Sequence, residues 1–366
     1  MGRQLTRQQQ LHKERYQKHV NELPWYVQEY CEEMDHKSPS TLLNYVHDYK
    51  LFFQWLIRAG IAESTSTKDI PIEVLANLRR KEAEAFFKHV KNTEYEVKKG
   101  VTRFPDQKSI DRKIVALKSL FKYLTTQSED DNGECYFYRN VMAKIETHSK
   151  KETQSARAKK IGSEILSKRD DRALLSFIAN EYLNLVAGTR KESYFLRDRE
   201  RDLAIMSLFL GSGIRVSELA NIRYDSFDFR KQQLSVIRKG GKEDTIVVTP
   251  SALDDVKEYM NIRSERYKAP KDEGPLFVSL YAGSYKPMSE RTIQDIVYKY
   301  TEAFTSGKKM SPHKLRHTYA KNLYDSTNNL VRVMSQLGHT SVETTTLYTV
   351  IDMDETRDDV NKMDEE

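Results

Sequence analysis

The strongest constraint on the fold is a helical stripe between residues 109 and 125. Apolar side chains recur there at steps of four, three, four and three residues, at Ile110, Ile114, Leu117, Phe121 and Leu124. This spacing matches the 3.6-residue period of an α-helix and gives the helix one face for burial. The other face carries four basic side chains, Arg112, Lys113, Lys118 and Lys122. That face is either simply solvated or laid along a DNA groove.

The region before this stripe also has a helical pattern. Apolar and aromatic residues predict helices at 42–57 and at about 81–90, and Gly60 is placed to end the first of them. No strand pattern interrupts the region, so we expect a small all-α domain over residues 21–145. It follows an arm, residues 1–20, with five basic residues and one acidic residue. This arm is either a solvated, frayed helix or a direct phosphate contact.

From about residue 166 the pattern becomes mixed. Two β-branched runs, at 233–238 and 245–249, flank the sequence Lys-Gly-Gly-Lys at 239–242, which predicts a hairpin. Helices are predicted around it at about 199–210, from 216, and at 251–266, 289–304, 312–326, 330–337 and 341–350. We therefore expect a second domain over residues 166–350 that is mainly helical with a small antiparallel sheet.

Charge is distributed unevenly along the 366 residues. The net charge is +6, and residues 351–366 alone carry −6, so the other 350 residues carry +12. A basic body indicates a polyanionic partner such as nucleic acid, and the acidic tail at 351–366 suits docking on basic protein. Between the two predicted domains, residues 146–165 form a basic linker with few apolar residues. The linker is either a flexible tether or a phosphate-backbone contact made by Lys150, Lys151, Lys159 and Lys160.

Composition excludes several classes of protein. No stretch approaches the roughly 18 unbroken apolar residues of a membrane span, and no apolar segment of the secretory kind follows the first residues. The two cysteines, Cys31 and Cys135, cannot build a disulfide framework or a zinc-binding pair. We expect a protein of a reducing interior with no membrane partner.

The most informative segment for chemistry is residues 311–317. Ser311 followed by Pro312 predicts a helix start, because the hydroxyl can cap a free N–H and proline has none. His313 and Arg316 then share one face of the first turn, where the helix dipole and free amides favour an anion, so they can clamp a phosphate. His313 and His317 could instead pair on a metal. The metalloprotease version of that motif needs glutamate directly after the first histidine, where this chain has lysine, so we expect no metal.

Other groups suited to phosphate chemistry lie at separate places in the sequence. Arg215 follows the glycine-containing break at 211–213, and Glu218 lies three residues later. Lys239 lies at the predicted hairpin tip, and His339 precedes a capping box formed by Thr340 and Glu343. The short predicted helix that follows carries Tyr348, and each of these features alone is a weak signal.

Taken together and in this order, the residues resemble the catalytic set of the tyrosine recombinase (phage integrase) family. The matching positions are Arg215, Lys239, His313, Arg316, His339 and Tyr348. The resemblance covers about 165–350, and the N-terminal region resembles the family's SAM-like core-binding domain. Segments 24–27 and 136–142, with the long basic linker, are similar to Xer recombinases, in particular the streptococcal and lactococcal single-recombinase type. One departure is Ser-Gly-Ile-Arg at 212–215, where the family commonly has Thr-Gly-Leu-Arg.

The resemblance implies a covalent mechanism. Tyr348 would attack a phosphodiester and form a 3′-phosphotyrosyl link with a free 5′-hydroxyl. Arg215 and Arg316 would hold the non-bridging oxygens through forked, charge-assisted hydrogen bonds. His313 and His339 would donate to the same phosphate, although His313 could instead take the tyrosine proton. The scheme needs no metal and no other cofactor.

The remaining positions have less certain assignments from sequence. Lys239 is the expected general acid for the leaving 5′-oxygen, with Lys242 as the alternative on the same hairpin. Glu218 is expected either to orient the cationic site or to be a plain helix-surface acid. His317 is expected to be structural.

The resemblance also implies partners and a setting. Four protomers would act on two double-stranded DNA sites, with the tail after Tyr348 packed into a neighbour. The Xer similarity implies resolution of chromosome dimers at a dif-like site, and so a role in chromosome partition and cell division. The expected location is the bacterial cytoplasm, associated with the nucleoid, with an FtsK-type DNA translocase as a possible partner. The alternatives are an integrase or transposase of a mobile element, a type IB topoisomerase, and a non-catalytic DNA-binding protein, which would have no reason to keep Tyr348.

Overall fold

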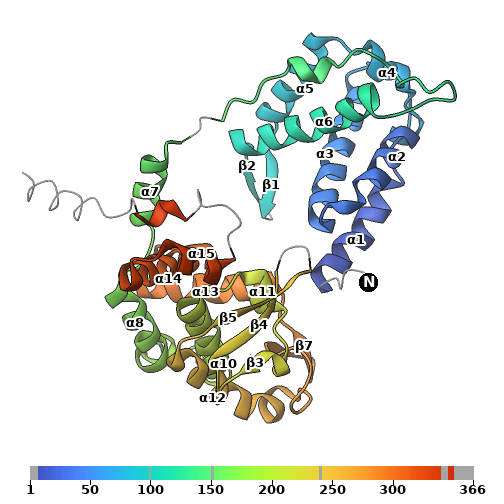
Figure 1. The fold of residues 1–366 in the computed structure, drawn as a ribbon. Coiled ribbons are helices and arrows are strands. Elements are labelled where there is room, and N and C mark those ends of the chain that lie inside the picture. Colours follow the sequence, from blue (N-terminus) through green and yellow to red (C-terminus); the bar gives the residue numbers. More distant parts are fainter. Residues whose placement is uncertain (1–6, 99, 150–151, 239–240, 339–344, 350–366) are drawn as a thin grey trace, which may run out of the picture. The chain divides into compact units, whose positions relative to one another are not determined.

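A computed structural model describes residues 7–98, 100–149, 152–238, 241–338 and 345–349 (Figure 1). The chain divides into two compact units, Met1–Lys151 and Glu152–Glu366, and each unit has its own apolar core. The predicted architecture of two mainly helical domains with little antiparallel sheet is confirmed. Lys239, His339, the capping box, Lys150, Lys151 and the tail lie outside the described residues.

Unit 1 is helical with one small hairpin. Its α-helices are α1 (Arg7–Val20), α2 (Trp25–Glu33), α3 (Pro39–Arg58), α4 (Ile72–Asn77), α5 (Arg80–Asn92) and α6 (Gln107–Thr126). Short 3-10 helices lie at Met34–His36, Thr67–Asp69 and Val141–Lys144. Strands β1 (Tyr95–Lys98) and β2 (Val101–Arg103) pair antiparallel and project from the helices of this unit (Figure 1).

The predicted stripe forms the centre of the unit 1 core. Helix α6 begins after Asp106, whose side chain accepts a 2.8 Å hydrogen bond from the backbone N–H of Ser109. All five stripe residues on α6 are buried and pack with aromatic residues of α3 and α5. Gly60 has a φ of +67° directly after the end of α3, as predicted for a residue that ends this helix.

One detail of unit 1 differs from the sequence expectation, which contained no strands before residue 145. The hairpin β1–β2 is short, and its apolar residues Tyr95, Val97 and Val101 are exposed. A strand pattern depends on the alternation of buried and exposed residues over several positions. This ribbon has no buried face, so it left no such alternation in the sequence.

The predicted linker also contains regular structure. Residues 154–162 form helix α7 (Gln154–Gly162), capped by Thr153, whose side chain accepts a 3.2 Å hydrogen bond from Ala156 N. Ala158 is fully buried and α7 packs near residues 346–349, so the helix belongs to unit 2. One small buried residue is too weak a signal to predict a helix from periodicity.

Unit 2 surrounds two small antiparallel sheets with helices. After α7 come α8 (Lys168–Ser176), a π-helical turn (Phe177–Glu181), α9 (Tyr182–Val186), α10 (Arg190–Ser212), α11 (Val216–Ala220) and a 3-10 turn (Tyr224–Ser226). Strands β3 (Phe227–Asp228), β4 (Gln233–Ile237) and β5 (Glu243–Val247) form one sheet in that order, and β6 (Val278–Tyr281) pairs with β7 (Ser284–Pro287). The other helices are α12 (Pro250–Tyr267), α13 (Glu290–Phe304), α14 (Pro312–Thr327), α15 (Leu330–Leu337) and the 3-10 helix η7 (Thr346–Thr349).

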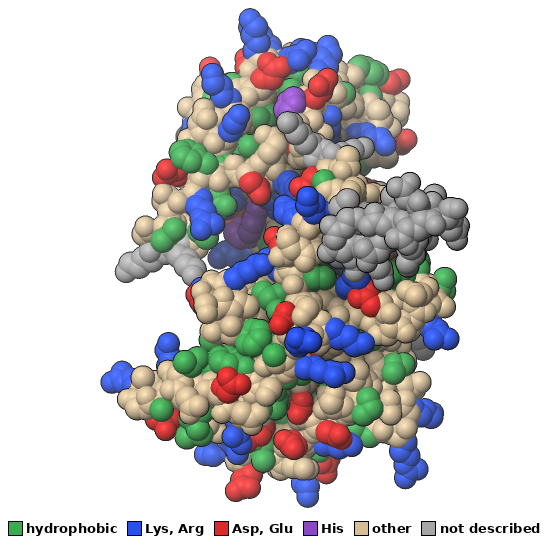
Figure 2. Space-filling view, turned by 90° about the vertical axis from the view of Figure 1, so that its left-hand side faces the viewer, with side chains coloured by type: hydrophobic (Ala, Val, Ile, Leu, Met, Phe, Trp, Pro, Cys, Tyr) green, Lys and Arg blue, Asp and Glu red, His purple; other side chains and the backbone are tan. Residues whose placement is uncertain are grey.

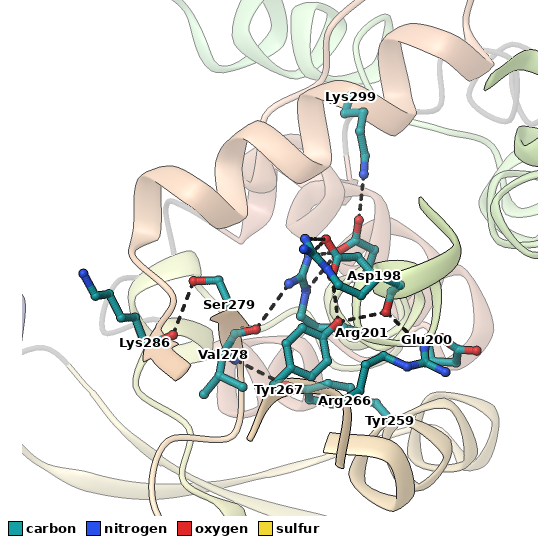
Figure 3. A network of polar contacts seen from close by, with 12 residues as sticks. Asp198, Glu200, Arg201, Tyr259, Arg266, Tyr267, Val278, Ser279, Lys286 and Lys299 are labelled. Carbon is teal, nitrogen blue, oxygen red and sulfur yellow. Dashed lines mark hydrogen bonds and ion pairs between the residues drawn. The ribbon is translucent and has the colours of Figure 1, made fainter. Parts of the chain in front are cut away.

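Helix α10 is the central element of unit 2. Its C-terminal half is buried and packs against α12 and α14. Its middle carries a buried polar network in which Asp202 accepts hydrogen bonds from Arg201, Lys299 and Tyr300. Figure 3 shows the surroundings of this network, with Asp198, Arg201 and Lys299 labelled. This network fixes α10 against α13, and α10 places the loop at 213–215 beside α14.

Candidate active site

The loop after α10 requires glycine at its centre. Gly213 ends the helix with a φ of +66°, a conformation that other residues rarely adopt. A Cβ at this position would lie 2.4 Å from Cδ1 of Tyr319 and 2.9 Å from Cδ2 of Leu337. Glycine therefore allows the chain to pass directly against α14 and α15, and the next turn places Arg215 beside them.

Arg215 is held by a carboxylate and a backbone carbonyl. It is the N-cap of α11, and its Nη1 donates a 2.8 Å hydrogen bond to Glu218 Oε1, while its backbone N donates to Oε2 at 3.0 Å. Its Nη2 donates to the carbonyl of Gly338 at 3.3 Å. The Arg215 side chain is 35% exposed, which leaves room for an anionic ligand.

Arg316 joins three segments from a buried position. Its side chain comes from the first turn of α14, and the residue is only 3% exposed. Nη1 donates to the carbonyl of Gly213, and Nη2 donates to the carbonyl of Leu337. Burial, with the nearby charge of Arg215, lowers the pKa of Arg316 to about 10. Two guanidinium groups are thus gathered at the start of α14, where the helix dipole adds further positive potential.

The histidines of α14 continue this cluster toward the tyrosine. The rings of His313 and His317 meet edge to face with centroids 4.2 Å apart. His317 Nδ1 lies 2.6 Å from the hydroxyl of Tyr348, which is buried. Burial raises the pKa of Tyr348 to about 12, although the charges of Arg316 and Arg157 act in the opposite direction. Desolvation, then Arg316, Arg215 and Arg157, lower the pKa of His313, whose residue remains exposed.

Glu218 neutralises two guanidinium groups from one buried position. Besides Arg215, it accepts hydrogen bonds from Nη1 of Arg238 at 3.1 and 3.2 Å. Desolvation alone would raise the pKa of Glu218, but the backbone N–H of Arg215 and the charges of Arg238 and Arg215 lower it overall. Of the two sequence alternatives, the buried position fits a group that orients the cationic site better than a surface acid.

Arg238 is a site residue that sequence reasoning missed. Its Nε donates to Asp244 at 2.8 Å, and its Nη2 donates to the carbonyl of Gln336 at 3.1 Å. Arg238 thereby connects the β4–β5 hairpin to α15 and to Glu218. The signal was present in the period of two along β4, because Leu234 and Val236 are buried and Arg238 follows in the same register.

Gln336 makes a second connection between α15 and the hairpin. Its Nε2 donates to the carbonyl of Val247 at 2.7 Å, and its Oε1 accepts from Val247 N at 3.1 Å. Nε2 also donates to the carbonyl of Ser212 at 3.1 Å. A side-chain amide thus pairs with β5 as a further strand would, and it holds the segment before Gly338 in place.

Similarity to known proteins shows the family of this chain. The phage integrase family model matches residues 178–355. The tyrosine recombinase XerS of Streptococcus gordonii is 38% identical over 352 residues, which cover 96% of this chain and 98% of the relative. The chain belongs to the tyrosine recombinase (phage integrase) family. XerS of Streptococcus uberis is 39% identical over 348 residues, covering 93% of this chain and 96% of the relative.

Solved structures with the same fold include recombinases bound to DNA. A XerH site-specific recombinase on a palindromic difH substrate has a TM-score of 0.61 at 17% identity, covering 96% of this chain and 93% of that one. A lambda integrase dimer bound to a core site has a TM-score of 0.54 at 16% identity, covering 89% and 94%. This recombinase is therefore of the Xer type, a site-specific DNA recombinase that cleaves and rejoins DNA strands.

The active-site helix α14 begins without the side-chain cap that the sequence predicts. Ser311 does occupy the N-cap of α14, but its side chain makes no capping hydrogen bond, which corrects the sequence expectation. Pro312 at the first helical position accounts for the helix start without it. As for metals, no three His, Cys, Asp or Glu side chains gather as ligands within the described parts of the chain.

The hairpin lysines remain an open choice. Lys242 is exposed, and its carbonyl accepts a 2.7 Å hydrogen bond from Arg238 N. Lys239 lies outside the described residues, so the alternative general acids Lys239 and Lys242 both stay predictions. His339 also lies outside them, directly after Gly338.

The basic residues predicted to contact DNA differ in their exposure and in their ion pairs. Arg112 and Lys113 on α6 both approach the buried carboxylate of Asp48, at 3.0 and 3.1 Å. Lys118 is half-buried, whereas Lys122, Lys159 and Lys160 are exposed, and Lys150 and Lys151 are not described. On the face drawn in Figure 2, Lys and Arg side chains are spread widely among Asp and Glu side chains.

None of the described helices is long and apolar enough to cross a membrane.

Proposed function

We propose that this recombinase cuts each DNA strand through Tyr348, forming a 3′-phosphotyrosyl bond and releasing a 5′-hydroxyl. The observation that carries the proposal is the convergence of Arg215, Arg316, His313 and Tyr348 around the start of α14. A tyrosine whose pKa is raised to about 12 is a poor nucleophile until positive charge stabilises its anion, and this cluster supplies that charge.

We assign the individual groups the roles that the family resemblance implies. Arg215 and Arg316 hold the non-bridging oxygens, where negative charge increases as the tyrosine attacks. His313 and His339 donate to the same phosphate, and Lys239 or Lys242 protonates the leaving 5′-oxygen. Arg316 donates hydrogen bonds to two backbone carbonyls, so its position is fixed before DNA binds. The guanidinium group therefore needs little reorganisation when the phosphate arrives.

The covalent intermediate explains why no energy source is required. The phosphotyrosyl bond conserves the energy of the broken phosphodiester, so the 5′-hydroxyl of a second strand can reverse the step. Exchange between two duplexes needs two sites, which supports a homotetramer on paired double-stranded DNA. The tail at 351–366 would pack into a neighbouring protomer and coordinate which pair of subunits is active.

We further propose that the substrate is a dif-like chromosomal site and that the reaction resolves chromosome dimers. The support is the similarity to XerS over nearly the full chain. The enzyme would then act in the bacterial cytoplasm on the nucleoid, in chromosome partition and cell division, with an FtsK-type DNA translocase as a candidate partner. An integrase or transposase of a mobile element is the alternative with the same chemistry.

A nicked DNA substrate tests the chemistry directly, because loss of the short strand beyond the cut traps the covalent adduct. Wild-type protein should form an adduct through the 3′-phosphate at the cut, and the strand beyond the cut should carry a 5′-hydroxyl. Tyr348→Phe should bind the same DNA and form none, whereas the exposed Tyr281, changed to phenylalanine, should react normally. An adduct that persists in Tyr348→Phe would contradict the proposal.

The substrate is tested in cells. Trapped protein–DNA adducts are isolated and the attached DNA is sequenced. A single chromosomal site near the replication terminus supports dimer resolution. Adducts confined to the ends of a mobile element would instead establish the alternative.

A further inference from the structure

The hydroxyl of Tyr348 contacts His317, a residue that the sequence predicts to be structural. His317 Nδ1 lies 2.6 Å from this oxygen, and their ring centroids are 5.7 Å apart. Both residues are buried, at 7% and 1% exposure. A buried hydroxyl is destabilising when it has no hydrogen-bond partner, so the bond contributes to where the tyrosine lies.

The position of His317 relates this bond to the phosphate site. His317 lies four residues after His313 on α14, on the same helix face, and their rings are in contact. The charged groups around the pair are Arg316 on the same helix and Arg157 on α7. A hydroxyl held by His317 therefore lies within the positive field of Arg316, the neighbouring residue on α14.

We infer that His317 is the positioning residue for the nucleophile. With the proton of the neutral ring on Nε2, Nδ1 accepts the hydrogen bond from the Tyr348 hydroxyl and keeps its oxygen directed toward the phosphate clamp. The inference rests on the proposed function of Tyr348. The inference also gives the two histidines different roles. Among the described contacts, His317 lies against the tyrosine oxygen, whereas His313 packs against His317.

Two substitutions of nearly equal shape separate the hydrogen bond from packing. In His317→Asn, the side-chain oxygen branches from the same carbon as Nδ1 and can accept the bond. In His317→Leu, the side chain fills a similar volume and accepts nothing. Adduct formation on the nicked DNA should be within about tenfold of wild type for asparagine and slower by about 10² for leucine, the size expected for misplacement of a reacting group.

The readouts exclude a merely structural effect. Rates are compared at equal DNA occupancy, measured by gel shift, and at equal folded fraction, measured by thermal melting. Equal rates of adduct formation for the two variants would overturn the inference, because the hydrogen bond would then have no effect. A leucine variant faster than wild type would also overturn it, because the bond would then restrain Tyr348. If the leucine variant does not fold, a loss of 10² in the asparagine variant alone overturns it.

A sulfur substitution in the DNA identifies the step that His317 serves. A 5′-bridging sulfur leaves without needing a proton, so it should restore cleavage to variants of the general acid, such as Lys239→Ala or Lys242→Ala. The defect of His317→Leu should remain on this DNA, because His317 acts on the attacking oxygen. Full recovery would assign His317 to the leaving group and refute the inference, whereas no adduct from wild type on either DNA would remove the proposed function as well.

Discussion

The guanidinium group of Arg238 packs directly against the α-carbon of Gly338. A Cβ on Gly338 would lie 2.8 Å from both Cζ and Nε of Arg238, and the residue has a φ of +60°. Arg238 is in turn fixed by Glu218, Asp244 and the carbonyl of Gln336. The hairpin that carries the candidate lysines and the segment that leads to His339 are therefore joined at one point.

This contact predicts a large effect from a single methyl group. Gly338→Ala should cost about 1–2 kcal/mol for the left-handed backbone alone, and more for displacing Arg238. Gly188→Ala is the matched control in the same unit, since Gly188 has a φ of +74° with no atom within 4 Å of the added Cβ. Both variants carry the left-handed backbone cost, so both should unfold at a lower temperature, but Gly338→Ala should lose more stability and it alone should lose adduct formation. Equal losses in the two variants would show that the contact has no role.

Arg238 itself should matter for stability and catalysis. Arg238→Met removes a donor from the buried Glu218 while it keeps most of the side-chain volume, and breaking such a buried pair costs about 3 kcal/mol. Glu218 would then be paired with Arg215 alone, which should shift the Arg215 guanidinium from its place in the site. Adduct formation should therefore also slow. Arg223, whose pair with Asp225 is exposed, should tolerate the same change with little loss. A denaturation midpoint unchanged in Arg238→Met would contradict this account.

Much of the fold was predictable because its helices have one buried face. The stripe on α6, the break at 211–213 and the β4–β5 hairpin each carry a local pattern that the tertiary structure preserves. The β1–β2 ribbon and α7 escaped prediction because neither has a repeated buried position. A periodic pattern of apolar residues arises from burial of one face. Elements that bury few residues therefore show no clear period in the sequence.

The candidate site was predictable only where a motif places residues close in sequence. His313 and Arg316 share one helical turn, and Arg215 with Glu218 spans another. Arg238 reaches Glu218 and Gln336 at separations of 20 and 98 residues, and His317 reaches Tyr348 at a separation of 31 residues. Such pairs are created by the packing of α14, α15 and the hairpin, and no local pattern in the sequence specifies them.

The buried network on α10 should dominate the stability of unit 2. Asp202 is fully buried and accepts hydrogen bonds from Arg201, Lys299 and Tyr300. Asp202→Asn leaves Arg201 without its main counter-charge and should cost about 3–5 kcal/mol. Tyr300→Phe removes one hydrogen bond and should cost about 1 kcal/mol. Chemical denaturation of the two variants should reproduce this order, and the reverse order would refute it.

The same carboxylate predicts a dependence on pH. Desolvation would raise the pKa of Asp202, but Arg201 and Lys299 lower it overall in the folded protein. Its stabilisation is therefore complete above the ordinary aspartate range near 4 and is lost as the pH falls below it. The difference in unfolding free energy between wild type and Asp202→Asn should shrink on acidification. A difference that stays constant down to the acid transition would exclude Asp202 as its source.

The last prediction concerns the end of unit 1, where the chain leaves toward α7. Asp111 on α6 accepts hydrogen bonds from the backbone N–H of His148 at 3.1 Å and of Ser149 at 2.7 Å. Despite some desolvation, the bonds from Ser149, Gln107 and these amides lower the pKa of Asp111 to about 2. The anchor should therefore hold throughout the neutral range and fail only as the pH falls toward that value.

Removing the anchor should free the chain beyond residue 147 without unfolding unit 1. In Asp111→Ala, amide hydrogen exchange at His148 and Ser149 should speed up, while exchange in the α6 core stays slow. Asp130→Ala offers a comparison, because Asp130 accepts the backbone N–H groups of Asn132 and Glu134 in a distant exposed turn. Strand exchange requires both units to hold their DNA in register, so Asp111→Ala should recombine more slowly than Asp130→Ala at equal DNA occupancy. If exchange at residues 148 and 149 is the same in both variants, Asp111 is not the anchor.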